Sequence, residues 1–156
     1  MPFYSPSTGG FFHRELHGEA MPADVVPITA KRHGKLLEQQ AAGATIVAGP
    51  KGPVARFPNR DELELGAKAR IRRAARRRIL AIATLELQSN DNAAIATAAL
   101  ELQLTGAATV DFAAALDRRR LIDAVRAASN AIELELAELS AAELEAFSPV
   151  NHPLWP

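Results

Sequence analysis

Two histidines near the start of the chain, His13 and His17, are the first residues whose type and spacing could do chemistry. Four positions apart, their imidazoles would share one face of a helix, and paired imidazoles of this kind can ligate zinc. The glycines at positions 9, 10 and 18 argue against a stable helix here, and no third ligand is obvious. The metalloprotease motif His-Glu-x-x-His needs a glutamate directly after the first histidine, where this chain has Arg14. We therefore expect no metal site and assign both histidines to a turn or an interface.

Nucleophilic and phosphate-transfer chemistry lack the residues that they require. The chain has no cysteine, no Gly-x-Ser-x-Gly motif and no glycine-rich phosphate loop. The segment 49–52, Gly-Pro-Lys-Gly, is too short for such a loop and leads into a predicted strand. Neighbouring carboxylates such as Glu62 and Glu64 are common on exposed helices. The sequence therefore predicts no enzyme and no cofactor.

Charge is segregated along the chain. A block of arginines at 70–78 resembles a nucleic-acid-binding patch, whereas residues 127–156 contain glutamates but no lysine or arginine. In an antiparallel helix pair these two blocks would lie side by side and fix the direction of pairing. Because the chain has 18 basic and 18 acidic residues, nucleic-acid binding is the weaker alternative. We expect charge pairing between two sets of side chains: Arg73, Arg76 and Arg77 on one helix, and Glu133, Glu135 and Glu138 on the other.

The distribution of proline divides the chain into two regions. Seven of the ten prolines lie within the first 58 residues and the other three within the last eight. Proline suits turns and strand edges but breaks helix interiors. We therefore expect an α+β protein, with a β-rich module over residues 1–58 and a helical region with a Pro/Trp tail over residues 59–156.

The module should contain two β-hairpins and one helix. Residues 3–5 and 10–13 are aromatic strands joined by Pro-Ser-Thr-Gly turn residues. Thr29 is placed to cap a helix from Ala30 to Ala42 that buries Leu36 and Leu37, and Gly43 is placed to end it. Residues 44–48 and 53–57 form the second hairpin, with a four-residue loop.

Helical periodicity dominates the second region. It predicts one helix over 61–88, broken at Ser89-Asn90-Asp91, a shorter one over 92–104 that ends at Thr105-Gly106, and a third over 110–139. The two long helices have these apolar seams: Ile71, Ala75, Ile79, Ile82 and Leu85, and Leu121, Val125, Ala128, Ile132, Leu136 and Leu139. They should fold back as an antiparallel hairpin, followed by a short helix that a Ser140–Glu143 capping box begins. No apolar run approaches the length of a membrane span.

The first 53 residues resemble the N-terminal module of bacteriophage tail-fibre assembly proteins, the tail-fibre chaperones that also occur in prophages and tail-like bacteriocins. The resemblance covers about a third of the chain, and no motif is recognised in the helical remainder. It is carried by an ordered string of residues: Phe3-Tyr4-Ser5, Thr8-Gly9-Gly10-Phe11-Phe12, Leu16-His17-Gly18, Pro22-Ala23-Asp24-Val25-Val26-Pro27-Ile28-Thr29, His33, Leu36-Leu37, Gln40, Gly43, and the hairpin from Ile46-Val47 to Gly52-Pro53.

The resemblance implies a non-enzymatic protein that binds a trimeric tail fibre and assists its folding, trimerisation or attachment. Before they associate, fibre chains expose strand edges and apolar surface that a small binding protein can shield. The protein would act in the cytoplasm of the host bacterium. Some relatives remain on the fibre tip, so a structural tail, baseplate or fibre-tip component retained in the virion is the alternative. Self-association through the helices is a further interaction to consider.

Partner contacts are expected at both ends of the chain. The tail over 149–156 carries the only tryptophan and either packs back on the helices as a lid, which we favour, or presents an apolar peptide to a partner. Whether the aromatic side chains of the first hairpin face a partner or the protein's own core is left open. The candidate partner-binding residues are Tyr4, Phe11, Phe12, His17, Leu154 and Trp155.

Overall fold

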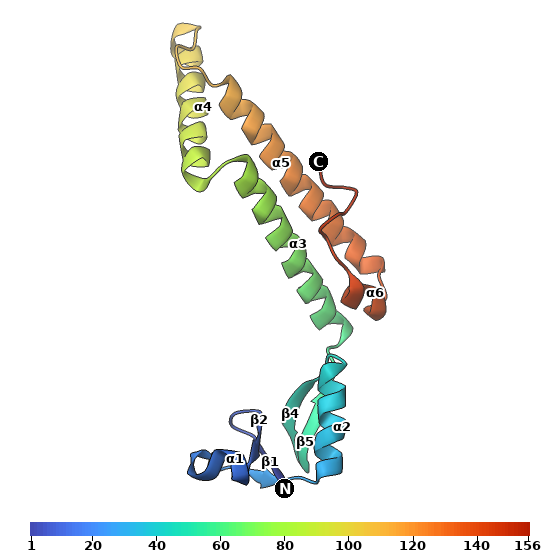
Figure 1. Cartoon of the computed structure of the whole chain (residues 1–156). Coiled ribbons are helices and arrows are strands. Elements are labelled where there is room, and N and C mark those ends of the chain that lie inside the picture. The colour runs from blue at the N-terminus through green and yellow to red at the C-terminus, as the bar shows by residue number, and fades with distance from the viewer. The chain divides into compact units, whose positions relative to one another are not determined.

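The computed structural model describes all 156 residues, which divide into two compact units, Met1–Asn59 and Arg60–Pro156 (Figure 1). Short antiparallel strands and one long helix build the first unit, and helices build the second. The α+β class expected from the sequence is therefore confirmed. None of the helices combines the length and the apolar character that crossing a membrane requires.

Two small antiparallel sheets form the first unit. In the first sheet, β1 (Pro2–Ser5) lies between β2 (Gly10–His13) and β3 (Val26–Pro27), and a turn of helix, α1 (Arg14–His17), and a 3-10 turn, η1 (Gly18–Ala20), follow β2. The second sheet pairs β4 (Thr45–Gly49) with β5 (Gly52–Arg56). Its loop is shorter than the four residues expected, because Gly49 pairs directly with Gly52, whose φ of 103° suits glycine.

Helix α2 (Ala30–Ala41) covers the core of the first unit. As expected, the Thr29 side chain caps it by accepting a hydrogen bond from the backbone N–H of Arg32, at 3.1 Å. The expected burial of Leu37 is wrong, because this side chain is 43% exposed. Successive helical residues point about 100° apart, and α2 turns only the side of Leu36 inward. The core consists of Tyr4, Ile28, Leu36 and Ile46, with Phe11 and Ala55 packed against it.

The second unit is an antiparallel helical hairpin, as its periodicity predicts. One arm consists of α3 (Arg60–Ile82) followed by α4 (Leu85–Thr105), and both lie alongside α5 (Ala113–Glu135), which runs in the opposite direction (Figure 1). A 3-10 turn, η2 (Leu136–Glu138), leads to α6 (Ala141–Ala146), which packs against α3. The Ser140–Glu143 capping box at the start of α6 is present as expected.

The first arm breaks at Ala83-Thr84 and not at residues 89–91, where the sequence predicts it. Thr84 has an extended backbone and caps α4 by accepting a hydrogen bond from the N–H of Leu87, at 3.2 Å. The side-chain amide of Gln88 donates to the carbonyl of Ala83 at 2.9 Å, which satisfies a backbone group at the end of α3. Residues 89–91 continue α4, because Asp91 is held by Arg118 of α5 rather than turning back on its own backbone.

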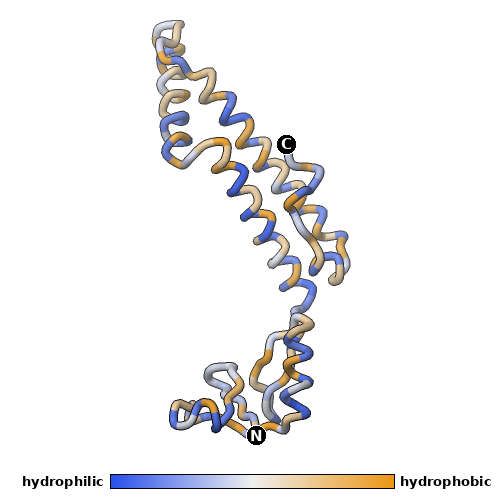
Figure 2. The backbone as a smooth tube through the Cα atoms, in the orientation of Figure 1, coloured by the Kyte–Doolittle hydropathy of each residue, from blue (hydrophilic) through white to orange (hydrophobic).

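The largest core of the second unit lies where α3, the end of α5 and α6 meet. It contains Ala67, Ile71, Ile132, Leu136 and Leu144, against which Leu63, Leu139, Phe147 and Trp155 pack. Figure 2 shows hydrophobic and hydrophilic positions interleaved along these helices.

Two residues expected in the seams lie outside them. Leu85 is 65% exposed because the break at Thr84 starts a new helix with a different phase. Leu121 is 52% exposed because its neighbour Ile122 takes the inward position on α5.

Candidate functional site

The first hairpin has one aromatic face toward the core of its unit. Tyr4 pairs with Phe11 across the two strands, and their ring centres lie 5.6 Å apart. The Tyr4 side chain is 1% exposed, so its nomination as a partner contact is wrong in this fold. Phe11 packs against the same core, and its ring meets His33 edge-on at 4.6 Å. Side chains alternate between the faces of a strand, which sends these two inward together.

The opposite face of the hairpin is partly exposed to solvent. Phe3 pairs with Phe12, and both rings are only half-buried. The Arg14 guanidinium lies 5.8 Å from the Phe3 ring centre, and the exposed His17 ring lies 5.2 Å from that of Phe12. Of the nominated residues, Phe12 and His17 therefore belong to what we call the outer aromatic face: Phe3, Phe12, Arg14 and His17. Phe3 is not among the nominated residues, and its pairing with Phe12 across the two strands places it on this face.

The two histidines brace a local turn. Although the neighbouring glycines argue against a helix, one turn forms at α1 and ends at Gly18, whose φ is 49°. The backbone N–H of His13 donates to Nδ1 of His17 at 3.1 Å. The structure contains no group of three or more His, Asp or Glu side chains arranged to hold a metal ion. Burial, followed by the neighbouring His13, lowers the pKa of His33.

Asp24 fixes the loop between β1 and β2. Its Oδ1 accepts a hydrogen bond from the Ser5 hydroxyl, and its Oδ2 accepts one from the Ser7 backbone N–H, each at 2.7 Å. The Ser5 hydroxyl, followed by the Ser7 N–H, lowers the pKa of the Asp24 carboxyl. These partners lie 19 and 17 positions away along the chain, so no local sequence signal marks the role of Asp24.

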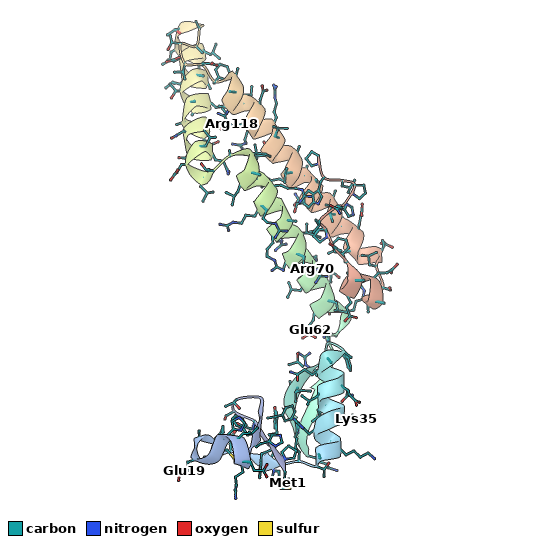
Figure 3. All side chains as sticks on the ribbon, viewed as in Figure 1. Met1, Glu19, Lys35, Glu62, Arg70 and Arg118 are labelled. Atoms are coloured by element: carbon teal, nitrogen blue, oxygen red, sulfur yellow. The ribbon has the colours of Figure 1, made fainter.

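Part of the arginine block on α3 holds the second unit together. Arg72 forms a two-point ion pair with Glu133 of α5. Arg70, labelled in Figure 3, donates to the carbonyl of Leu144 at 2.7 Å. Arg78 donates to the carbonyl of Val150 at 2.6 Å, and its guanidinium lies 4.5 Å from the Trp155 ring centre.

The predicted pairing of Arg73, Arg76 and Arg77 with Glu133, Glu135 and Glu138 is wrong. Glu133 pairs with Arg72 instead, and Oε2 of Glu135 lies 3.2 Å from Nε2 of His152 in the tail. The three arginines are exposed because the inward positions of this stretch of α3 belong to Ile71, Ala74 and Ala75. No hydrogen bond or ion pair joins them to an acidic side chain in the structure, so their charges face solvent. We call this set the arginine face: Arg73, Arg76 and Arg77.

A concave surface flanks each side of the arginine face. The larger, the α3–α4–α5 groove, has a volume of about 400 Å³ and is lined by Arg72, Ala75, Arg76, Ile79, Leu80, Leu85, Gln88, Arg126, Ser129 and Asn130. The smaller has a volume of about 230 Å³ and is lined by Arg70, Arg73, Arg77, Ser148, Pro149 and Val150. The first combines apolar side chains with cationic edges, whereas three arginines line the second.

The C-terminal tail packs back on the helices as a lid. The Trp155 indole N–H donates to the carbonyl of Pro149 at 2.6 Å, and the ring packs against the core that includes Leu136 and Leu144. Trp155 is therefore engaged within its own unit, whereas the neighbouring Leu154 is exposed. Of these two nominated residues, only Leu154 is placed to contact a partner without movement of the tail.

Polar contacts secure the far end of the hairpin. Asp91 accepts hydrogen bonds from Arg118, labelled in Figure 3, at 2.6 and 2.8 Å, and this guanidinium lowers the pKa of the carboxyl. Glu101 accepts from the N–H and the hydroxyl of Thr109 and thereby closes the loop between α4 and α5. Outside these contacts, α4 exposes several large apolar side chains: Leu85, Leu87, Leu100, Leu102 and Leu104. Leu85 and Leu87 lie in the first turn of α4, and Leu100, Leu102 and Leu104 lie toward its end.

Comparison of the chain with known protein families, with curated proteins and with solved structures finds no match. Its function is therefore inferred from its own residues and surfaces. Those surfaces are the outer aromatic face in the first unit, and the arginine face, the flanking grooves and the exposed leucines of α4 in the second.

Proposed function

We propose that this protein is an assembly chaperone for a bacteriophage tail fibre, which it binds while the fibre chains fold and trimerise. The observation that carries the proposal is the ordered string of residues within positions 3–53 that resembles the N-terminal module of tail-fibre assembly proteins. This string reaches every strand and helix of the first unit. A resemblance of this kind therefore concerns a whole folding module rather than a scattered set of positions.

Several residues of the string have separate structural roles, which supports reading it as one module. Tyr4 and Leu36 lie in the core, and Thr29 caps α2. Asp24 fixes the first loop through Ser5. Phe12 and His17 lie instead on the outer aromatic face. A half-buried aromatic pair beside a cation is well suited to protein recognition, since aromatic and arginine side chains contribute strongly to interfaces.

The second unit supports a binding role with surfaces of a different kind. It exposes leucines along α4 and arginines on α3 that have no acidic partner within the chain. A fibre chain that has not yet trimerised presents apolar surface and unpaired strand edges, and covering them suppresses misassembly. We propose that the second unit supplies contacts specific to the cognate fibre.

A structural component retained at the fibre tip or in the tail is the second candidate, since it would use the same surfaces. Localisation separates the two candidates. A chaperone that departs is found only in the host cytoplasm, whereas a retained component is found in purified particles at a fixed ratio to the fibre.

Co-expression tests the proposed function. The cognate fibre, defined as the tail fibre encoded beside this chain, is produced in bacteria with and without the protein. We expect the protein to raise the yield of soluble, trimeric fibre and to co-purify with fibre during assembly. Fibre that is equally soluble and trimeric when made alone would contradict the proposal.

A further inference from the structure

We propose that the arginine face of α3 and the adjoining α3–α4–α5 groove bind an acidic segment of the tail fibre that also carries apolar side chains. This inference rests on the proposed function and adds to it the chemistry and the location of one contact. The arginine face provides positive charge, and the groove provides apolar surface.

The exposed arginines indicate that the partner segment is acidic. Arg73, Arg76 and Arg77 carry three positive charges within five consecutive residues of one helix, and no acidic side chain of the chain pairs with them. Arg73 and Arg77 stand four positions apart, where like charges repel each other. A protein whose formal net charge is zero thus keeps a concentrated cationic surface, which favours an anionic partner.

The groove beside the arginine face indicates that the partner segment also carries apolar side chains. Arg76 belongs both to the arginine face and to the groove, so the two are continuous. Ile79, Leu80 and Leu85 line the groove, and Leu80 and Leu85 are exposed. Its volume of about 400 Å³ accommodates one or two large side chains. An apolar anchor inserted here would remove these leucines from water.

Carboxylates fit this surface better than nucleic-acid phosphates. Two other arginines at the groove already bind carboxylates of the chain, Arg72 to Glu133 and Arg126 to Asp123. Grooves that bind single-stranded nucleic acid combine positive charge along an extended track with aromatic rings on which bases stack. The α3–α4–α5 groove is lined by aliphatic and polar side chains and contains no aromatic residue. The combination of arginines with leucines and isoleucine therefore favours an acidic, amphipathic protein segment.

Three matched variants separate charge from shape. The first reverses the arginine face: Arg73→Glu, Arg76→Glu and Arg77→Glu. The second reverses three exposed cations elsewhere: Lys31→Glu, Lys35→Glu and Lys51→Glu, so that the net charge changes equally. The third makes the groove polar with Leu80→Ser and Leu85→Ser, at positions whose exposure keeps the core intact.

Each protein is mixed with three fluorescent probes and followed by fluorescence anisotropy. The probes are a peptide of alternating leucine and glutamate, the same peptide with serine in place of leucine, and an oligothymidine. Each protein is also co-expressed with the cognate fibre, and thermal unfolding verifies that all variants fold.

We expect the wild-type protein to prefer the leucine–glutamate peptide. Reversal of the arginine face should weaken that binding on the order of tenfold and abolish the gain in fibre trimer. The groove variant should lose the preference for leucine over serine, and the control variant should behave like the wild-type protein.

Two results overturn the inference while leaving the proposed function intact, provided that the wild-type protein still assists the fibre. One is unchanged peptide binding and fibre yield after reversal of the arginine face. The other is tighter, steeply salt-dependent binding of the oligothymidine, which would assign the surface to nucleic acid. Failure of the wild-type protein to assist the fibre overturns the proposed function and this inference together.

Discussion

Arg72 and Glu133 join α3 to α5 through two parallel hydrogen bonds, Nε to Oε1 and Nη2 to Oε2, each 2.9 Å long. The Glu133 carboxylate raises the pKa of the Arg72 guanidinium through these hydrogen bonds and through its charge. The next residue, Arg73, is exposed and has no acidic partner. A single step along α3 therefore separates an arginine that pairs with α5 from one whose charge faces solvent.

Reversal of these two neighbours should have different consequences for stability. We expect Arg72→Glu to lower the midpoint of thermal unfolding, because it places two carboxylates against each other, and Arg73→Glu to leave the midpoint nearly unchanged. Adding Glu133→Arg to Arg72→Glu should restore part of the loss. Circular dichroism at a series of temperatures measures these variants beside the wild-type protein. Equal effects of the two single reversals would contradict the assignment of Arg72 as the structural arginine.

Local sequence signals predict the elements that are built from neighbouring residues. Thr29 meets Arg32 three positions later, Ser140 meets Glu143, and Gly106 ends α4 in the left-handed conformation with a φ of 77°. Each interaction closes within one helical turn, so the sequence carries it without tertiary information. The proline distribution likewise indicates the change from strands to helices, and along the chain the first compact unit ends at Asn59 and the second begins at Arg60.

Contacts between distant residues account for what the sequence does not predict. Ser89-Asn90-Asp91 has turn-forming residue types, but Arg118, 27 positions beyond Asp91, keeps that segment helical. The choice of Arg72 over its neighbours for pairing depends on the rotation of α3 against α5. The inward position of Tyr4 depends on strand register in the same way. The spacing of apolar residues predicts which face of a helix or strand is buried, but it does not predict which residues of other elements pack against that face.

Replacement of a buried core residue should have a much larger effect than replacement of an exposed neighbour on the same helix. We expect Ile132→Ala to lower the free energy of unfolding by about 2 to 5 kcal/mol, because it leaves a cavity in the core of the second unit. Leu134, 77% exposed on the same helix, is the control, and its replacement by alanine should change that free energy by less than about 0.5 kcal/mol. Chemical denaturation measures both values. Similar losses of unfolding free energy at the two positions would show that the buried face of α5 is not the one that contains Ile132.

The position of the helix break can be tested through its cap. Thr84→Ala removes the side-chain oxygen that accepts the Leu87 N–H and should lower the free energy of unfolding by about 0.5 to 2 kcal/mol. Ser89→Ala, within α4, should be neutral or slightly stabilising because alanine is the better helix former. Chemical denaturation again provides the measurement. A loss at Ser89 with none at Thr84 would return the break to residues 89–91.

Acid should loosen the first loop at a pH set by Asp24. Its pKa is lowered in the folded protein, so its contribution to stability is present above the unfolded pKa and is lost as pH falls through the folded pKa. We expect the NMR signal of the Ser7 amide to shift with a midpoint below the ordinary aspartate pKa of about 3.9. The Asp24→Asn variant should lack this transition, and the loop between β1 and β2 should be less stable at neutral pH because the carboxylate that accepts from Ser5 and Ser7 is gone. An unaltered titration of the Ser7 amide in that variant would exclude Asp24 as the group responsible.

Refolding of the purified cognate fibre in the presence and absence of this protein tests the proposed chaperone role most directly. The fibre is unfolded, diluted into buffer with or without a stoichiometric amount of the protein, and separated by sedimentation velocity. We predict a larger fraction of soluble fibre trimer with the protein, together with a complex that contains both chains during assembly. An identical trimer fraction in both samples, with no complex at any time, would contradict the proposed function.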